Sequence, residues 1–132
     1  MARLILFLGM LFSIGLQAQT MTFNCDYNAY SSEEGLADVE PPFSIQFLMD
    51  LDAQKAYIVG NQGSTEVSII PGTQGVSFVE VTDSGNVMTT SIVLDAKNDK
   101  DVGRTVHSRH VVVSGLGELM PSQYYGVCDT LL

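Results

Sequence analysis

Residues 106–110, Val-His-Ser-Arg-His, hold both histidines of the chain and one of its few basic side chains. Imidazole and guanidinium groups bind metal ions, anions and carboxylates, so this segment is the first candidate for chemistry. Side chains alternate between the two faces of a β-strand, which sends His107 and His110 to opposite sides. We therefore do not expect the two histidines to share a metal ion.

The sequence alone is compatible with either face of this segment pointing toward the core. The favoured arrangement points His110 inward with Val106 and Val112, as a hydrogen-bonded core histidine, and leaves His107 and Arg109 for solvent or a partner. In the other arrangement these polar groups line the interior and anchor a ligand in an apolar pocket. In a chain this acidic, an arginine is more often paired with a carboxylate than free for a ligand.

A second candidate segment lies near the end of the chain, at Pro121-Ser-Gln-Tyr124-Tyr125-Gly126. Adjacent tyrosines on a strand point to opposite faces, so one packs inward while the other presents its ring. An outward tyrosine suits a binding surface, although tyrosine is also an ordinary strand residue. The predicted binding residues are His107, Arg109, Tyr124 and Tyr125.

Catalytic and metal-binding motifs are missing from the sequence. There is no Gly-x-Ser-x-Gly, no His-Glu-x-x-His and no phosphate-binding glycine loop. The acidic groups Asp95, Asp99 and Asp101, and Asp50 and Asp52, lack the pattern of a calcium loop and are typical of solvated turns. We predict no enzyme activity, no metal and no cofactor. An enzyme would need a histidine within hydrogen-bond reach of a carboxylate.

The first residues have the three parts of a secretory signal. Arg3 gives the positive start, residues 4–16 form the apolar core, and Ala18 is a small residue at a cleavage position. The apolar run is short for a membrane span, and no cysteine follows it for lipid attachment. The sequence predicts a signal peptide over residues 1–18, one domain over residues 19–132, and a periplasmic or secreted protein without a membrane anchor.

The charge is strongly acidic, with 15 Asp and Glu against 6 Lys and Arg, and it moves from −9 to −10 when Arg3 is removed. Such a chain repels nucleic-acid phosphates and attracts cationic partners, although the charge also keeps an exported protein soluble. Nucleic-acid binding is therefore not expected. Neither the oligomeric state nor the identity of a ligand follows from composition.

Cys25 and Cys128 are the only cysteines and lie near the two ends of the exported chain. In an oxidising compartment such a pair normally forms a disulfide. The bond would bring the first and last segments side by side. A structural role is expected, because no Cys-x-x-Cys spacing indicates redox activity.

Short alternating segments separated by turn residues predict strands. They cover Thr22–Asn28, Phe43–Asp50, Lys55–Val59, Thr65–Ile70, Val76–Thr82, Val87–Leu94, Arg104–Val113 and Glu118–Cys128. The polar stretch Ala29–Pro42 and the charged stretch Asp95–Gly103 are expected to be loops. Pro121 indicates a sheet edge or a bulge.

These segments predict an all-β domain, an antiparallel meander of about eight strands. A meander of this size closes into a small barrel or half-barrel, or folds into a β-sandwich. A barrel is favoured, because its first and last strands are neighbours and a Cys25–Cys128 disulfide fits there.

The early Phe23-x-Cys25, the His107-Ser-Arg-His110 segment and the ending Pro121-Ser-Gln-Tyr-Tyr-Gly-Val-Cys128 resemble small uncharacterised secreted bacterial proteins. Residues 78–87 resemble, more distantly, a strand and turn of the periplasmic inhibitors of C-type lysozyme. That resemblance implies a small β-barrel that binds a cationic protein. No site residue is transferred from the inhibitors to this chain, because Ser84 stands where they have a lysine and the chain has no tryptophan.

The leading hypothesis is an exported barrel that acts as a binding module, with a cationic protein such as a lysozyme as its candidate partner. The alternative is a small-molecule carrier with an interior pocket.

Overall fold

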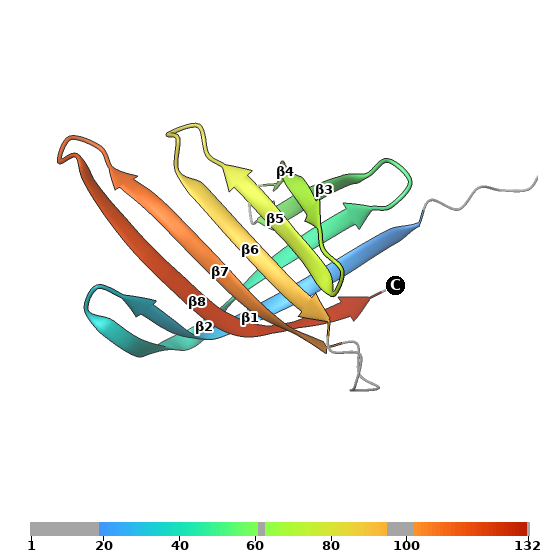
Figure 1. Ribbon diagram of the computed structural model, residues 1–132, viewed down its shortest axis with the longest axis horizontal. Coiled ribbons are helices and arrows are strands. Elements are labelled where there is room, and N and C mark those ends of the chain that lie inside the picture. The colour runs from blue at the N-terminus through green and yellow to red at the C-terminus, as the bar shows by residue number, and fades with distance from the viewer. Residues whose placement is uncertain (1–18, 61–62, 95–101, 132) are drawn as a thin grey trace, which may run out of the picture.

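A computed structural model describes residues 19–60, 63–94 and 102–131 (Figure 1). Within them the chain forms eight antiparallel strands and a closed barrel in which each strand pairs with the next and the last pairs with the first. The strands are β1 (Thr20–Ser32), β2 (Gly35–Asp50), β3 (Lys55–Gly60), β4 (Gly63–Pro71), β5 (Gly75–Val81), β6 (Val87–Leu94), β7 (Val102–Val113) and β8 (Glu118–Leu131). The predicted all-β meander is confirmed, and the closed barrel excludes the sandwich. The predicted signal peptide and the charged residues 95–101 lie outside the described residues.

The disulfide joins the two strands that close the barrel. Cys25 and Cys128 are direct partners in the β1–β8 ladder, and both side chains are fully buried. This confirms the predicted pairing of the first and last segments. In the part of the chain that the structure describes, no helix has the length and hydropathy needed to cross a membrane.

The predicted loop over Ala29–Pro42 is wrong. β1 continues to Ser32 and β2 begins at Gly35, so this stretch forms a long hairpin with Glu33 and Glu34 at its turn. The polar composition reflects the solvent exposure of the β2 strand and the half-buried position of residues 29–32 rather than an irregular backbone. Between the pairs Tyr27↔Phe43 and Ala29↔Asp38 the register shifts, and both prolines of β2 fall in this bulge, where an N–H is not needed.

The barrel has two different ends. We call one the hairpin end, where β1–β2, β3–β4, β5–β6 and β7–β8 turn back, and the other the terminal end, which carries the β2–β3 and β4–β5 turns and both ends of the described chain. At the hairpin end the β1–β2 and β7–β8 hairpins reach furthest, toward the left of Figure 1.

The middle of the barrel is filled by aromatic and aliphatic side chains. Phe47 stacks on Phe78 with ring centroids 4.5 Å apart, and Phe23 lies 5.9 Å from Phe78. These three residues and Ile92 are almost completely buried. Burial of such side chains contributes about 2 kcal/mol each relative to exposure, so this cluster is a main source of stability.

β8 carries two positions at which backbone chemistry limits the sequence. Gly126 faces β1 so closely that a Cβ atom there would lie 2.0 Å from the carbonyl oxygen of Asp26. Pro121 pairs with His110 on β7, whereas the β1–β8 ladder begins only at Gln123. Pro121 therefore lies on a free edge of β8, as predicted.

Candidate functional site

β7 turns His107 and Arg109 into the barrel and His110 toward solvent. His107 is 3% exposed, whereas His110 is exposed. The expectation of an inward His110 is therefore wrong. The register decides the face, because His107 is paired with the buried Thr90 on β6 and with Tyr124 on β8. The alternation of residues 106–112 in the sequence is compatible with either face pointing inward.

His107 lies in an aromatic cluster and is held neutral. Its Nδ1 atom forms a 2.8 Å hydrogen bond with the hydroxyl of Thr90. Its ring centroid is 5.8 Å from that of Tyr27 and 6.3 Å from that of Phe43. Burial, and to a smaller extent the positive charge of Arg109, lowers the pKa of His107 to about 4. His107 is therefore a neutral, positioned core side chain near neutral pH.

Arg109 occupies the same interior, two residues closer to the hairpin end. Its Nη1 donates a 3.3 Å hydrogen bond to the hydroxyl of Tyr124, and its Cζ lies 5.8 Å from the centroid of that ring. Within the described ranges the only ion pair is Lys55–Glu66, so Arg109 has no carboxylate partner there. Contact with a tyrosine ring stabilises a guanidinium group by about 1 kcal/mol when it is partly desolvated.

Tyr124 and Tyr125 point to opposite faces, as predicted. Tyr124 packs inside, edge-on to Phe43 at 4.8 Å and stacked on Tyr30 at 5.7 Å. Tyr125 lies on the outer face, where its hydroxyl bonds with Ser31 and donates to Gln123, each at 3.0 Å. The structure thus groups three predicted residues, His107, Arg109 and Tyr124, and separates Tyr125 from them.

A second buried hydroxyl completes this interior cluster. Tyr27 is fully buried, and its OH forms a 3.1 Å hydrogen bond with the hydroxyl of Thr105. Burial raises the pKa of Tyr27 to about 12, because the phenolate would be desolvated. Neither histidine has a carboxylate within ion-pair distance among the described residues. The described part of the chain also brings together no group of three potential metal ligands.

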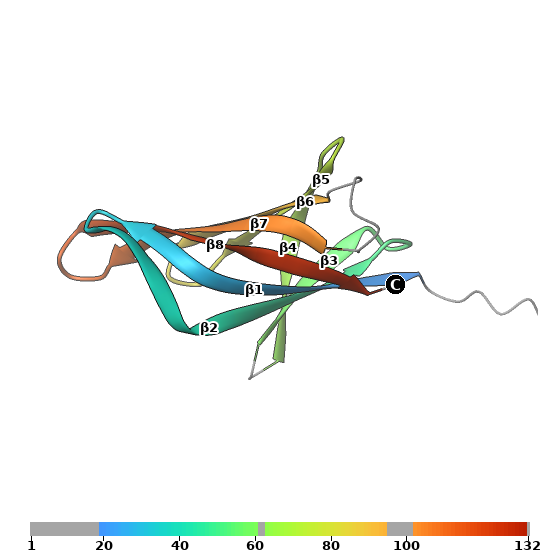
Figure 2. The ribbon, with the colours of Figure 1, turned by 90° about the horizontal axis from the view of Figure 1, so that it is seen from below.

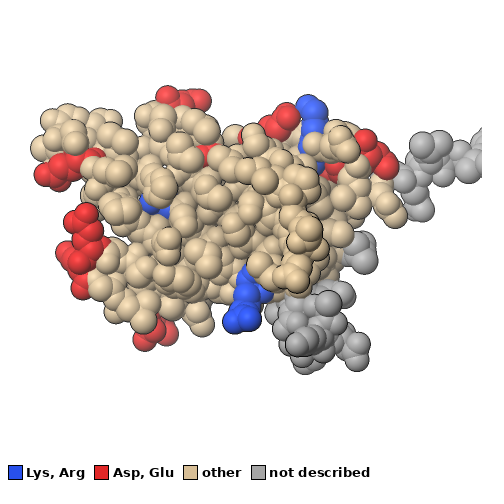
Figure 3. All heavy atoms as spheres, viewed as in Figure 1, with Lys and Arg blue, Asp and Glu red and all other residues tan. Residues whose placement is uncertain are grey.

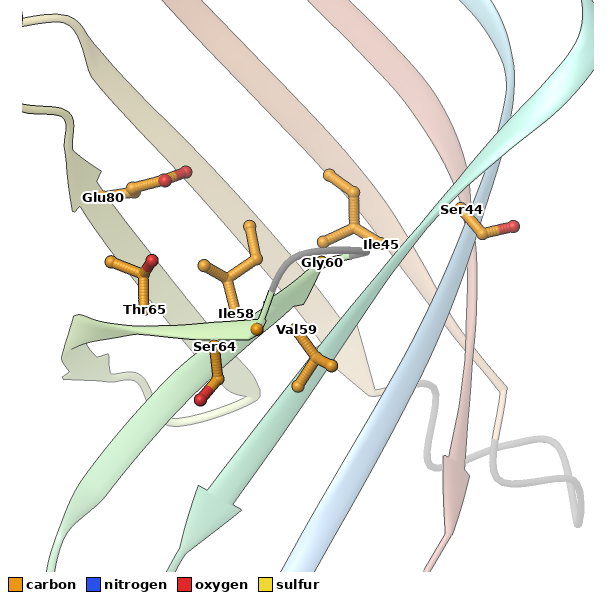
Figure 4. A pocket seen from close by; sticks show the side chains of 9 residues that line it. Ser44, Ile45, Ile58, Val59, Gly60, Ser64, Thr65 and Glu80 are labelled. Atoms are coloured by element: carbon orange, nitrogen blue, oxygen red, sulfur yellow. The ribbon is translucent and has the colours of Figure 1, made fainter.

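A cavity of about 440 Å³ opens at the hairpin end beside β2, β3, β4 and β5. Figure 4 shows Glu80, Thr65, Ile58 and Ile45 directed into one space, whereas Val59 and Ser64 point the other way. Glu80 is not among the residues predicted from the sequence. Its signal is parity, because Glu80 is two residues from the buried Phe78 on the same strand and so faces the same side.

A larger cavity, of about 890 Å³, opens at the terminal end. Its floor includes Phe23, and its walls are mainly apolar. The lining side chains are Met21, Met49, Leu51, Ile69, Pro71, Val76, Val93 and Leu94, with Thr73, Gln74 and Arg104 as the polar ones. The packed middle of the barrel separates this cavity from the hairpin end.

Exposed carboxylates gather at the hairpin end although they are far apart in sequence. They are Glu33, Glu34, Asp38, Glu40, Asp83 and Glu118. Of the described basic residues, only Arg109 lies at this end, inside the barrel, while Lys55 and Arg104 belong to the other end. In Figure 3 several Asp and Glu side chains, in red, lie along the left side of the molecule, where the β1–β2 and β7–β8 hairpins of Figure 1 end. This end therefore carries a concentrated negative field.

The same hairpin tips expose large apolar side chains. Leu36 is 76% exposed on the β1–β2 hairpin and Leu116 is 71% exposed on the β7–β8 hairpin, where Leu119 and Met120 are also exposed. Apolar groups surrounded by charge are typical of protein interaction sites. We call these carboxylates and apolar side chains together the acidic tips.

Comparisons with known proteins give no relative. No protein-family model, no curated protein and no solved structure matches the chain.

Proposed function

We propose that this protein is an exported binding module that docks a basic protein through its acidic tips, with a C-type lysozyme as the first candidate partner. The observation that carries the proposal is the coincidence of exposed carboxylates with exposed leucines on the β1–β2 and β7–β8 hairpins, which hold five of the six carboxylates of the hairpin end. The carboxylates steer a cationic partner during approach, and the leucines supply apolar contact once it has docked. The buried disulfide is compatible with a periplasmic or secreted location.

Charge removal at the tips tests the steering. In the variant Glu33→Gln/Glu34→Gln/Asp38→Asn/Glu118→Gln we expect the association rate with lysozyme to fall about tenfold at low salt, and its salt dependence to weaken. The control is Glu66→Gln/Asp129→Asn, which removes two exposed carboxylates away from the tips and is compared per charge removed. Surface plasmon resonance at several salt concentrations measures both rates.

Apolar contact is tested separately. Replacing Leu36 and Leu116 with serine should speed dissociation and leave the association rate unchanged, because apolar contacts form after the encounter. Leu131→Ser, an exposed leucine at the terminal end, is the control. Lysozyme with acetylated lysines is the charge control on the partner. Absence of lysozyme binding, or binding that ignores both salt and acetylation, contradicts the proposal.

The apolar cavity at the terminal end favours a second candidate, a carrier of small apolar molecules. Its volume of about 890 Å³ is within the range of ligand pockets. The carrier would hold its ligand at that end, since the middle of the barrel is packed. A Met49→Trp variant should fill the space and abolish binding of an apolar fluorescent probe, and equal probe binding by both forms would remove this candidate.

A further inference from the structure

The cavity beside Glu80 combines a carboxylate with apolar walls. Ile45 and Ile58 form the walls, and the Thr65 hydroxyl and the Glu80 carboxylate are its inward polar groups (Figure 4). A lysine or arginine side chain has the complementary arrangement, an aliphatic stem that ends in a cation. The volume of about 440 Å³ is sufficient for one such side chain.

The cavity opens because two strands separate. The β4–β5 ladder runs only from Ser68↔Val79 to Pro71↔Val76. Toward the hairpin end, β4 continues with β3 alone and β5 with β6 alone. In Figure 2 the green β3–β4 hairpin points away from the tips of the other hairpins. An incoming side chain can therefore enter between β4 and β5 without displacing a ladder.

Glu80 is available to a cation from outside. Among the described residues it has no hydrogen-bond or ion-pair partner. The interior Arg109 is two strands away, because Glu80 pairs with Met88 and Met88 pairs with Arg109. Arg109 is also directed to Tyr124. Of the residues that the structure describes, no lysine or arginine lines the cavity.

We propose that this cavity receives one basic side chain of the partner, with its stem between Ile45 and Ile58 and its charged head on Glu80. This inference rests on the proposed function, since it names the part of the partner that enters the barrel. The acidic tips attract the partner, and the cavity retains one of its side chains. The acidic tips therefore affect the association rate constant, and the cavity affects the dissociation rate constant.

Binding kinetics separate the two proposals. Glu80→Gln keeps the shape of the side chain and removes its charge, so we expect lysozyme to dissociate about tenfold faster with little change in association rate. Glu66→Gln, on the strand next to the cavity, is the matched control and should leave dissociation unchanged. Unchanged dissociation from Glu80→Gln overturns this inference, and slower association of the tip variant still supports the proposed function.

A small probe tests the cavity without any protein partner. In NMR titrations of the disulfide-bonded protein, n-butylguanidinium should shift the methyl signals of Ile45 and Ile58, and Glu80→Gln should reduce these shifts at least severalfold. Butyrate has a similar apolar chain with the opposite charge and should produce no such shift. Absence of shifts with n-butylguanidinium, or equal shifts in the wild type and Glu80→Gln, overturns the inference even if lysozyme does not bind.

Discussion

Cys25 and Cys128 lie directly opposite each other on the strands that close the barrel, with their Cα atoms 3.9 Å apart. They are 103 residues apart in sequence, so the bond constrains almost the entire described chain. In the chain-entropy model, a crosslink over so long a loop removes a large part of the freedom of the unfolded state.

Replacing both cysteines with alanine should lower the free energy of unfolding by about 2–5 kcal/mol. The barrel should stay closed near neutral pH, because the β1–β8 ladder continues from Thr22 to Ser31. Urea unfolding measures the loss, and far-UV circular dichroism should show an unchanged strand content. Reduced wild-type protein is the control and should match the variant. Equal unfolding midpoints for the oxidised and reduced forms would contradict this.

His107 should make the protein less stable in acid. Its folded-state pKa of about 4 lies below its ordinary value of 6.5, so at intermediate pH the unfolded chain binds a proton that the folded barrel does not. The stability from neutral His107 is complete above pH 6.5 and falls as the pH drops toward 4. The expected loss is about 3 kcal/mol.

Urea unfolding as a function of pH checks this contribution. His107→Gln should be less stable than the wild type at neutral pH and should lose less stability on acidification. His110→Gln, which changes an exposed histidine of the same strand, should keep the wild-type pH dependence. If the two variants follow the same pH profile, His107 is not the group responsible.

Ionisation of Tyr27 should lower the free energy of unfolding at alkaline pH. Because burial raises its folded-state pKa from 10.0 to about 12, the unfolded chain loses this proton first, and stability falls as the pH rises between these values. Tyr27→Phe should cost about 1 kcal/mol at neutral pH through the lost hydrogen bond with Thr105. It should also show a smaller decline in alkali, which thermal unfolding measures. A decline equal to that of the wild type would be evidence against this role.

Gly126→Ala should destabilise the barrel by about 3 kcal/mol or more, because the added methyl group would overlap the carbonyl oxygen of Asp26. The β1–β8 ladder would have to separate locally at the pair Tyr27↔Gly126. Gly60→Ala is the control, since the nearest atom to a Cβ there is 3.9 Å away. Urea unfolding of the two variants compares them, and equal stability would show that β1 and β8 can separate without cost.

The architecture could be predicted from local pattern in the strands that alternate clearly. Residues 43–49 place Phe and aliphatic side chains at every second position, and the turn at 51–54 joins β2 to β3 as expected. The hairpin over residues 29–42 could not be predicted in the same way. Its β2 strand is largely exposed and its β1 strand is half-buried, so no clear hydrophobic alternation marks them. Residues 29–31 of β1 also pair with β8, about a hundred residues later.

The candidate site was predicted only in part for a related reason. His107, Arg109 and Tyr124 were predicted as binding residues from their residue types. The face that they share depends on the register between β6, β7 and β8. Glu80 was not predicted as a site residue, because a single carboxylate on a strand is normally solvated. Its place in a cavity follows from the separation of β4 from β5, which local sequence does not encode.

The sequence by itself determined the strand-forming segments, the acidic charge and the pair of cysteines, because alternation, composition and residue type are local properties. Only the tertiary structure decided that the barrel closes, that His107 faces inward and that the carboxylates of separate hairpins meet at one end. These features depend on strand register and closure, which arise from contacts between residues far apart in the chain.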